Sequence, residues 1–252
     1  MMRAMPSKFY FGTNTKRDLD RQSHIDIVKS AIALSEVHPD VQFFVLPPDP
    51  LFGELKALAA GSNVWIGSQN VTYTTGPNVT GEVSARLLSE IGSDLVMAGH
   101  AERRALGEDG PIVGIQLRKL SDVKVNTLLC IGELEKTDDM KERLQAFRSQ
   151  MEPLGAIPRN QLIIAYEPVW SIGQNGEAAD PVYVEESIKQ IRSILIGLNR
   201  SGTPILYGGS VQEENAAFYS VICDGLFVGR AACAENGFKA VFEAGFNSRN
   251  KN

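Results

Sequence analysis

The stretch LIIAYEPVWSIGQNGEAAD, residues 162–180, joins a buried strand to a polar segment. Its first five residues, Leu162 to Tyr166, are apolar or aromatic, which is typical of a strand that is buried on both faces. The strand ends on a carboxylate, Glu167, and Pro168 follows it with a fixed backbone φ. A solvated charge at a strand end is the ordinary explanation of Glu167. Whether it has a chemical role depends on what stands at the ends of the other strands.

The same unit, a short apolar run followed by a longer amphipathic stretch, recurs eight times along the chain. Helical periodicity is clear between the runs, as in 24–37, 139–151 and 182–199. Buried strands that alternate with helices predict a parallel sheet covered by helices. The eight runs are 8–13, 41–46, 64–70, 94–100, 126–133, 162–168, 204–210 and 224–230.

Eight such units in about 250 residues predict a closed (β/α)₈ barrel, with residues 1–252 as a single domain. The chain has no linker, low-complexity tract or shift in composition that would divide it. The alternative is a doubly wound open sheet. Its phosphate-binding fingerprint, GxGxxG after the first strand, is missing from this sequence.

Composition and charge argue against several classes of protein. Of the 252 residues, 43% are hydrophobic and 22% are charged, as in ordinary globular proteins, and the net charge of −5 comes without basic clusters. A nucleic-acid partner or a membrane surface is therefore not expected, and no apolar run approaches the roughly 18 residues of a membrane span. Cys130, Cys223 and Cys233 form no CxxC pair, so we expect free thiols in a reducing cytoplasm and no metal site.

In a barrel of this kind the active site lies at the carboxyl ends of the strands. Pro168 would hold the direction of the Glu167 carboxylate there, and the segment 169–176 has the composition of a lid. A carboxylate under a lid loses solvation, so its pKa rises and it becomes a better base near neutral pH. The polar and glycine residues at the other strand ends are Asn14, Lys16, Gln69, Asn70, His100, Glu102, Gly208, Gly209, Ser210, Gly229 and Arg230.

His100, Lys16 and Glu102 each have an ordinary explanation beside the functional one. A histidine at a strand end is structural by default, but His100 begins the segment HAERR, where a helix dipole favours the neutral imidazole. A neutral imidazole can hydrogen-bond a carbonyl oxygen and then the enolate formed from it. Lys16 is either a surface lysine or a fixed positive charge in the mouth of the barrel. Glu102 is most simply an acid at a helix N-terminus, and it can also pair with Lys16.

The turns YGGSV (207–211) and GLFVGR (225–230) are rich in glycine and expose backbone N–H groups. Glycine turns are common, but a phosphate can bind to their N–H groups, and the phosphate sites of this fold follow strands seven and eight. A base, a neutral electrophile, a cation and a phosphate site together indicate one reaction class. This is proton abstraction next to a carbonyl in a small phosphorylated sugar, with no metal and no organic cofactor.

These motifs resemble the triosephosphate isomerase family over nearly the whole chain. The resemblance implies a TIM barrel, isomerase activity on a sugar phosphate without a cofactor, and a homodimer in which Thr80 reaches the site of the neighbouring subunit. The resemblance also implies a glutamate base that acts beside a neutral histidine. The segments that carry the resemblance are NTK (14–16), QNVTYTTGPNVTGE (69–82), AGHAERR (98–104), AYEPVWSIG (165–173), LYGGSV (206–211) and DGLFVG (224–229).

The resemblance also implies a role for each site residue. Glu167 would move a proton between adjacent carbons, and His100 would polarise the carbonyl and move protons between the oxygens. Lys16 would stabilise negative charge, with Asn14 and Glu102 supporting it. Contacts to the phosphate are expected from the lid and the two glycine turns, at Gly173, Gly208, Gly209, Ser210, Gly229 and Arg230.

The chain departs from the family pattern at the rim of the predicted site. The family usually has Trp at Thr15, Ser at Ala101, and Thr-Gly-Lys at the lid tip where residues 174–176 read Gln-Asn-Gly. Arg230 stands where the phosphate turn usually has a second glycine. The Arg230 side chain therefore either points away from the site or adds a charged donor to it.

The retained catalytic residues favour interconversion of glyceraldehyde 3-phosphate and dihydroxyacetone phosphate. The altered rim leaves a second substrate open, a four-carbon ketose phosphate such as erythrulose phosphate. A sugar-phosphate-binding protein without activity is less expected, because such a protein would have lost the base, the histidine or the lysine.

Overall fold

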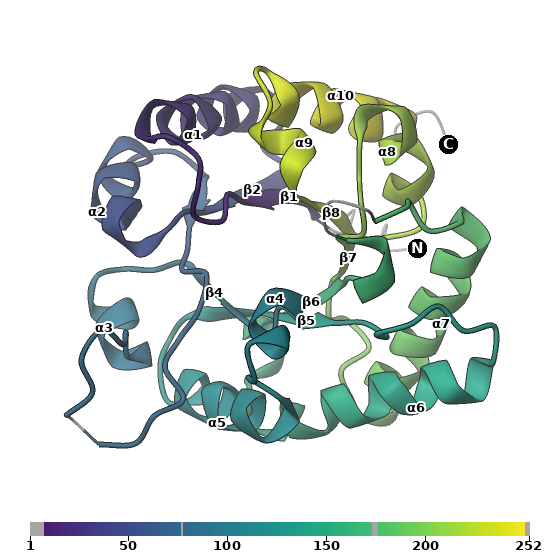
Figure 1. Cartoon of the computed structure of the whole chain (residues 1–252). Coiled ribbons are helices and arrows are strands. Elements are labelled where there is room, and N and C mark those ends of the chain that lie inside the picture. Colours follow the sequence, from purple (N-terminus) through teal and green to yellow (C-terminus); the bar gives the residue numbers. More distant parts are fainter. Residues whose placement is uncertain (1–7, 77, 173–175, 250–252) are drawn as a thin grey trace, which may run out of the picture.

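The computed structural model describes residues 8–76, 78–172 and 176–249 of the chain, and its eight parallel strands form a ring surrounded by helices (Figure 1). The strand order is β3-β2-β1-β8-β7-β6-β5-β4, and every pair in this order is parallel. This is the predicted TIM barrel in a single domain. The strands are β1 Phe9–Asn14, β2 Val41–Leu46, β3 Trp65–Ile66, β4 Leu95–Ala98, β5 Asn126–Ile131, β6 Leu162–Tyr166, β7 Ile205–Tyr207 and β8 Gly225–Val228.

The barrel closes between β3 and β4 through a single bridge. Ser68 pairs with Val96 in parallel fashion, just beyond the end of β3. The Ser68 N–H donates to the carbonyl of Leu95 at 2.9 Å, and the Met97 N–H donates to the carbonyl of Ser68 at 3.0 Å. The apolar run 64–70 therefore holds a strand of only two residues and a short extension.

Several helices begin where the sequence supplies a capping side chain. Asp139 accepts a hydrogen bond from the N–H of Lys141, and Asp180, followed by Pro181, accepts from the N–H of Val182. No helix in the described ranges is both long and apolar enough to cross a membrane. The helices are α1 Arg21–Val37, α2 Asp49–Leu58, α3 Ala85–Glu90, α4 Ala101–Ala105, α5 Gly110–Ser121, α6 Met140–Met151, α7 Pro181–Gly197, α8 Glu213–Ser220, α9 Arg230–Cys233 and α10 Gly237–Arg249, with short 3₁₀ turns η1 Glu152–Ala156, η2 Arg159–Gln161 and η3 Val169–Ser171.

Strand alternation decides which side chains reach the barrel interior. Along β6, Ile163 and Ala165 belong to the inner core of the barrel, whereas Ile164 and Tyr166 belong to the layer shared with the helices. Because side chains alternate with a period of two, Glu167 continues the inner row at the carboxyl end of the strand. The inner core consists of Phe44, Leu46, Leu95, Met97, Leu128, Cys130, Ile163, Ala165, Leu206 and Phe227.

The three cysteines are free, as the sequence predicted. Cys130 and Cys223 are buried, and Cys233 is partly buried. Cys130 lies in the inner core, one layer below Glu167.

Candidate active site

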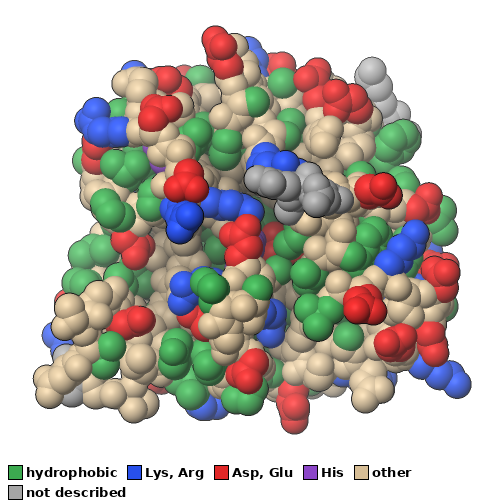
Figure 2. All heavy atoms as spheres, viewed as in Figure 1, with side chains coloured by type: hydrophobic (Ala, Val, Ile, Leu, Met, Phe, Trp, Pro, Cys, Tyr) green, Lys and Arg blue, Asp and Glu red, His purple; other side chains and the backbone are tan. Residues whose placement is uncertain are grey.

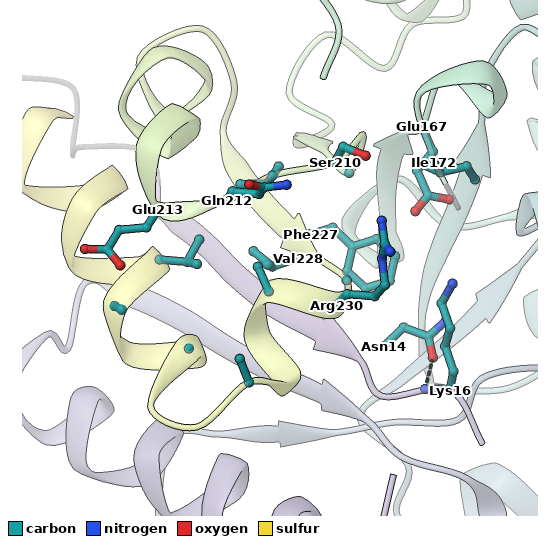
Figure 3. A pocket seen from close by; sticks show the side chains of 18 of the residues that line it. Asn14, Lys16, Glu167, Ile172, Ser210, Gln212, Glu213, Phe227, Val228 and Arg230 are labelled. Atoms are coloured by element: carbon teal, nitrogen blue, oxygen red, sulfur yellow. Dashed lines mark hydrogen bonds between the residues drawn. The ribbon is translucent and has the colours of Figure 1, made fainter. Parts of the chain in front are cut away.

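A cavity of about 530 Å³ lies at the carboxyl ends of the strands. Figure 2 shows acidic and basic side chains side by side around the hollow at the centre of this face. The cavity, here called the mouth cavity, brings together most of the predicted site residues (Figure 3): Asn14, Lys16, His100, Glu167, Gly208, Ser210, Gly229 and Arg230.

Glu167 is a buried carboxylate that faces this cavity, with only 5% of its surface exposed. Its Oε2 atom accepts no hydrogen bond from any described residue. Burial raises the pKa of Glu167, and His100, Cys130 and Lys16 partly offset this rise. The result is a carboxylate of increased basicity with one oxygen available to a substrate.

Gly208 makes the position of Glu167 possible. A Cβ atom at residue 208 would lie 2.8 Å from Cγ and 2.9 Å from Oε1 of Glu167, which is too close for any real contact. Glycine is therefore required here by the packing of the base, a reason that the sequence pattern had not suggested.

His100 is the N-cap residue of α4, and this position fixes its tautomer. The N–H of Glu102 donates to His100 Nδ1 at 3.2 Å. Because Nδ1 accepts, the neutral ring carries its proton on Nε2. That nitrogen lies 3.8 Å from Oε2 of Glu167, too far for a hydrogen bond between them. The base and a neutral donor thus face each other across the space where a substrate would lie.

Lys16 is held in the left-handed region, with a φ of 55° that costs a non-glycine residue about 1–3 kcal/mol. Two hydrogen bonds hold this backbone: the Lys16 N–H donates to Asn14 Oδ1, and Gln69 Nε2 donates to the Lys16 carbonyl, each at 2.9 Å. The Lys16 ammonium pairs with the carboxylate of Glu102. Asn14 therefore contacts the backbone of Lys16 and Glu102 contacts its ammonium.

The turn after β7 lies at the mouth cavity, which Gly208 and Ser210 line. Ser210 has a φ of 48°, and its hydroxyl donates to the carbonyl of Ser171 in the lid hinge. Within the described part of the chain, the N–H groups of Gly209 and Ser210 donate to no other residue. A Cβ at Gly229 would meet no atom within 4 Å, so open space lies beside this residue. This geometry can bind a phosphate through backbone N–H groups.

Four predicted site residues do not line this cavity as described. Glu102 lines the neighbouring cavity, and Gly209 lies in the turn after β7 without lining the mouth cavity. Gly173 lies outside the described residues. Thr80 is exposed in the loop after β3 and does not line the mouth cavity.

The sequence did not predict the role of Glu133, which holds the lid hinge η3 through hydrogen bonds. Its buried carboxylate accepts hydrogen bonds from Trp170 Nε1 at 2.9 Å and from the hydroxyls of Tyr183 and Tyr166 at 2.9 and 3.1 Å. The signal was present in the sequence, because the run 126–133 also ends on a carboxylate after a glycine.

Comparisons with known proteins agree with this geometry. The family model described as triosephosphate isomerase matches residues 9–245. The chain is 32% identical to an L-erythrulose-1-phosphate isomerase of Brucella melitensis, over 92% of this chain and 94% of that protein. It is 30% identical to an L-erythrulose-1-phosphate isomerase of Rhizobium rhizogenes, over 94% of both chains. It is 34% identical to a triosephosphate isomerase of Idiomarina loihiensis, over 81% of this chain and 84% of that protein. The chain belongs to the triosephosphate isomerase family of sugar-phosphate isomerases.

Proposed function

We propose that this protein isomerises a four-carbon ketose phosphate of the L-erythrulose-1-phosphate type by moving a proton between adjacent carbons. The observation that supports the chemistry is the pair formed by Glu167 and His100. A buried carboxylate oxygen that accepts no hydrogen bond from the described residues stands 3.8 Å from His100 Nε2, inside a cavity that also holds Lys16. No group besides these side chains is needed to form and stabilise an enediolate.

In the proposed reaction, Glu167 removes the proton from the carbon next to the carbonyl. His100 Nε2–H donates to the carbonyl oxygen and stabilises the negative charge that develops on it. The Lys16 ammonium adds a positive charge at the same place, and the turn at Gly209 and Ser210 binds the phosphate. His100 gives its Nε2 proton to the former carbonyl oxygen and takes a proton from the neighbouring hydroxyl, so that the second oxygen becomes the carbonyl. Glu167 delivers the abstracted proton to the former carbonyl carbon, which completes the isomerisation.

The position of the phosphate decides what product forms. In a ketotetrose 1-phosphate, C1 carries the phosphate ester, and the neighbour of the carbonyl that carries both a hydrogen and a hydroxyl is C3. Proton transfer from C3 to C2 leaves the carbonyl on C3, so the product is again a ketose phosphate. A triose phosphate lacks the hydroxymethyl group on the reacting carbon, and the same transfer interconverts a ketose and an aldose.

Two observations support the four-carbon substrate over the triose. The relatives named L-erythrulose-1-phosphate isomerase match 92–94% of this chain, whereas the triosephosphate isomerase of Idiomarina loihiensis matches 81%. In addition, Arg230 lines the mouth cavity where the family usually has glycine. The triose remains the second candidate, because that triosephosphate isomerase is 34% identical over the part it matches.

The experiment is a parallel measurement of kcat/KM on L-erythrulose 1-phosphate and on glyceraldehyde 3-phosphate. We expect the four-carbon sugar to be favoured by at least about tenfold, which corresponds to roughly 1.4 kcal/mol of transition-state binding. Product analysis by NMR in D₂O should find a second ketose phosphate with deuterium on the reacting carbons. A value on the triose near the ceiling of about 10⁸–10⁹ M⁻¹s⁻¹, with little activity on the tetrulose, would overturn the choice of substrate.

A further inference from the structure

Arg230 is the feature of the mouth cavity that the isomerisation chemistry does not use. It is the first residue of α9, and it follows Gly229 directly. Figure 3 shows its side chain projecting from the start of α9 into the cavity, toward the side where Ser210 and Glu167 lie. Of the two possibilities that the sequence left open, the side chain therefore takes the one that faces the site.

The charges around the cavity divide it into two regions. Among the described residues that line it, the lysines and arginines are Lys16 and Arg230. The Lys16 ammonium pairs with the Glu102 carboxylate, and Arg230 brings a second basic group to this space. Figure 3 shows Glu213 at the end of the cavity away from Glu167 and Lys16, and Glu214 and Glu235 also line the cavity. An anion that enters is repelled by these carboxylates, and on the inner side it meets Arg230 and Lys16 beside the buried Glu167 carboxylate.

The turn after β7 lies on the side of the cavity toward which the Arg230 side chain projects (Figure 3). The N–H groups of Gly209 and Ser210 donate to no other described residue, and the space beside Gly229 is open. A guanidinium has a planar fork of N–H donors that fits two oxygens of a phosphate at once. Backbone donors on one side and a cationic fork on the other form a site for a phosphate monoester dianion.

We propose that Arg230 is a substrate-binding residue whose side chain binds the phosphate of the substrate. This role rests on the proposed function in one respect, namely that the substrate is a phosphorylated sugar. It adds a charged contact to a site that would otherwise bind the phosphate with backbone N–H groups. The contact is made to the phosphate and not to the reacting carbons, so Arg230 contributes to binding of substrate and transition state alike.

The test measures binding of inorganic phosphate by isothermal titration calorimetry, and KM and kcat on the preferred sugar phosphate. In Arg230→Gln we expect the Kd of inorganic phosphate and the KM to rise by about tenfold or more, since a hydrogen bond between charged groups is lost. We expect kcat to change much less than KM. Arg230→Lys keeps the charge without the fork, so its affinity for phosphate should lie between those of Arg230→Gln and the wild type.

Arg86→Gln is the matched control, because Arg86 is an exposed arginine on α3 whose partner is Glu90 on the same helix. It makes the same change of net charge outside the cavity and should leave both constants unchanged. The proposal fails if Arg230→Gln binds inorganic phosphate as the wild type does, or if Arg86→Gln loses the same affinity. Because inorganic phosphate has no carbon chain, a loss confined to Arg230→Gln supports this role even if the preferred sugar is a triose or turnover is absent.

Discussion

The burial of Glu167 makes the free energy of unfolding depend on pH. Burial raises its pKa above the ordinary value of 4.5, so the folded protein binds this proton more tightly than the unfolded chain does. The contribution of Glu167 to stability is then fully present below about pH 4.5 and is lost as the pH rises through the raised pKa. The ionised form that acts as the base is the form that the fold tolerates least.

Glu167→Gln should therefore gain stability over the wild type as the pH rises. The amide resembles the protonated carboxyl in shape but cannot ionise, so the two proteins should have similar free energies of unfolding near pH 4.5 and diverge toward pH 8. The variant should also lose about 10²–10⁴-fold in kcat. Chemical denaturation across this pH range measures the first effect, and steady-state kinetics the second. A stability difference that does not depend on pH would contradict the assignment.

Gly208→Ala should damage catalysis through the position of the base. The added Cβ would lie 2.8 Å from Cγ of Glu167, so the carboxylate has to move, and a displacement of this kind costs on the order of 10²-fold in kcat. Gly53→Ala in α2 is the control, because a Cβ there meets no atom within 4 Å. The control should be fully active and slightly more stable, by about 0.5–1 kcal/mol. Equal activity of the two variants would show that Gly208 does not support Glu167.

The sequence predicted the site residues that stand at strand ends, but it did not predict Glu133, which holds the lid hinge through hydrogen bonds. Lys16, His100 and Glu167 were predicted because polar residues after buried strands all meet at one mouth, and the structure brings these three together. Glu133 was missed because its partners, among them Trp170, come from distant segments. A contact between residues 37 positions apart has no local pattern that a single sequence could show.

At the scale of elements, the lid hinge η3 is tied to its neighbours by the Glu133 carboxylate. Trp170 in η3 donates to Glu133 at 2.9 Å, and so does Tyr183 from the first turn of α7. Burial and Glu133 raise the pKa of Tyr183 to about 12, so this hydroxyl remains a donor at neutral pH. The Glu133 carboxylate therefore holds the hinge η3 against α7 through these two hydrogen bonds.

Tyr183→Phe should weaken the attachment of the hinge η3 to α7 through Glu133. It leaves a buried carboxylate with one donor fewer, which costs about 1–3 kcal/mol in the free energy of unfolding. We also expect KM and kcat to change together, because the hinge positions the lid. Tyr10→Phe serves as the control, since the Tyr10 hydroxyl makes no hydrogen bond to another described residue. A Tyr183→Phe protein with the stability of that control would show that the tether is dispensable.

Periodicity predicted the bounds of long helices but not those of short ones. The helices α6 and α7 begin within a residue or two of the predicted 139–151 and 182–199, because each has a capping Asp and a clear apolar period. The helices α4 and α9 have five and four residues, too few for any periodicity to appear. Their existence depends on tertiary contacts, and both carry residues at the mouth of the site.

At the scale of the whole molecule, the single chain leaves a second cavity open beside the reaction centre. This side cavity, of about 400 Å³, is lined by Lys16, His100 and Glu102 and by parts of the loop 69–82. Thr80 is exposed in the same loop. A loop from a second copy of the chain would fill such a cavity and exclude water from the site.

We therefore predict a homodimer in solution, with twice the chain mass of 27.5 kDa, and a monomeric and weakly active Thr80→Arg variant. A long charged side chain in the loop would oppose its burial against a partner. Sedimentation equilibrium gives the mass, and kcat/KM measured on the same samples gives the activity. A wild-type monomer with full activity would refute the prediction.

The single bridge at Ser68 has a consequence for how the barrel comes apart. Seven of the eight seams between strands are continuous ladders, and the seam between β3 and β4 is one bridge wide. Thermal fluctuations open a closed ring where the fewest bonds must break, so amide protons there exchange with solvent before those of the ladders. The loop 69–82 begins directly after this seam. A second copy that binds this loop would stabilise the seam between β3 and β4. The lifetime of the closed barrel would then rise with protein concentration.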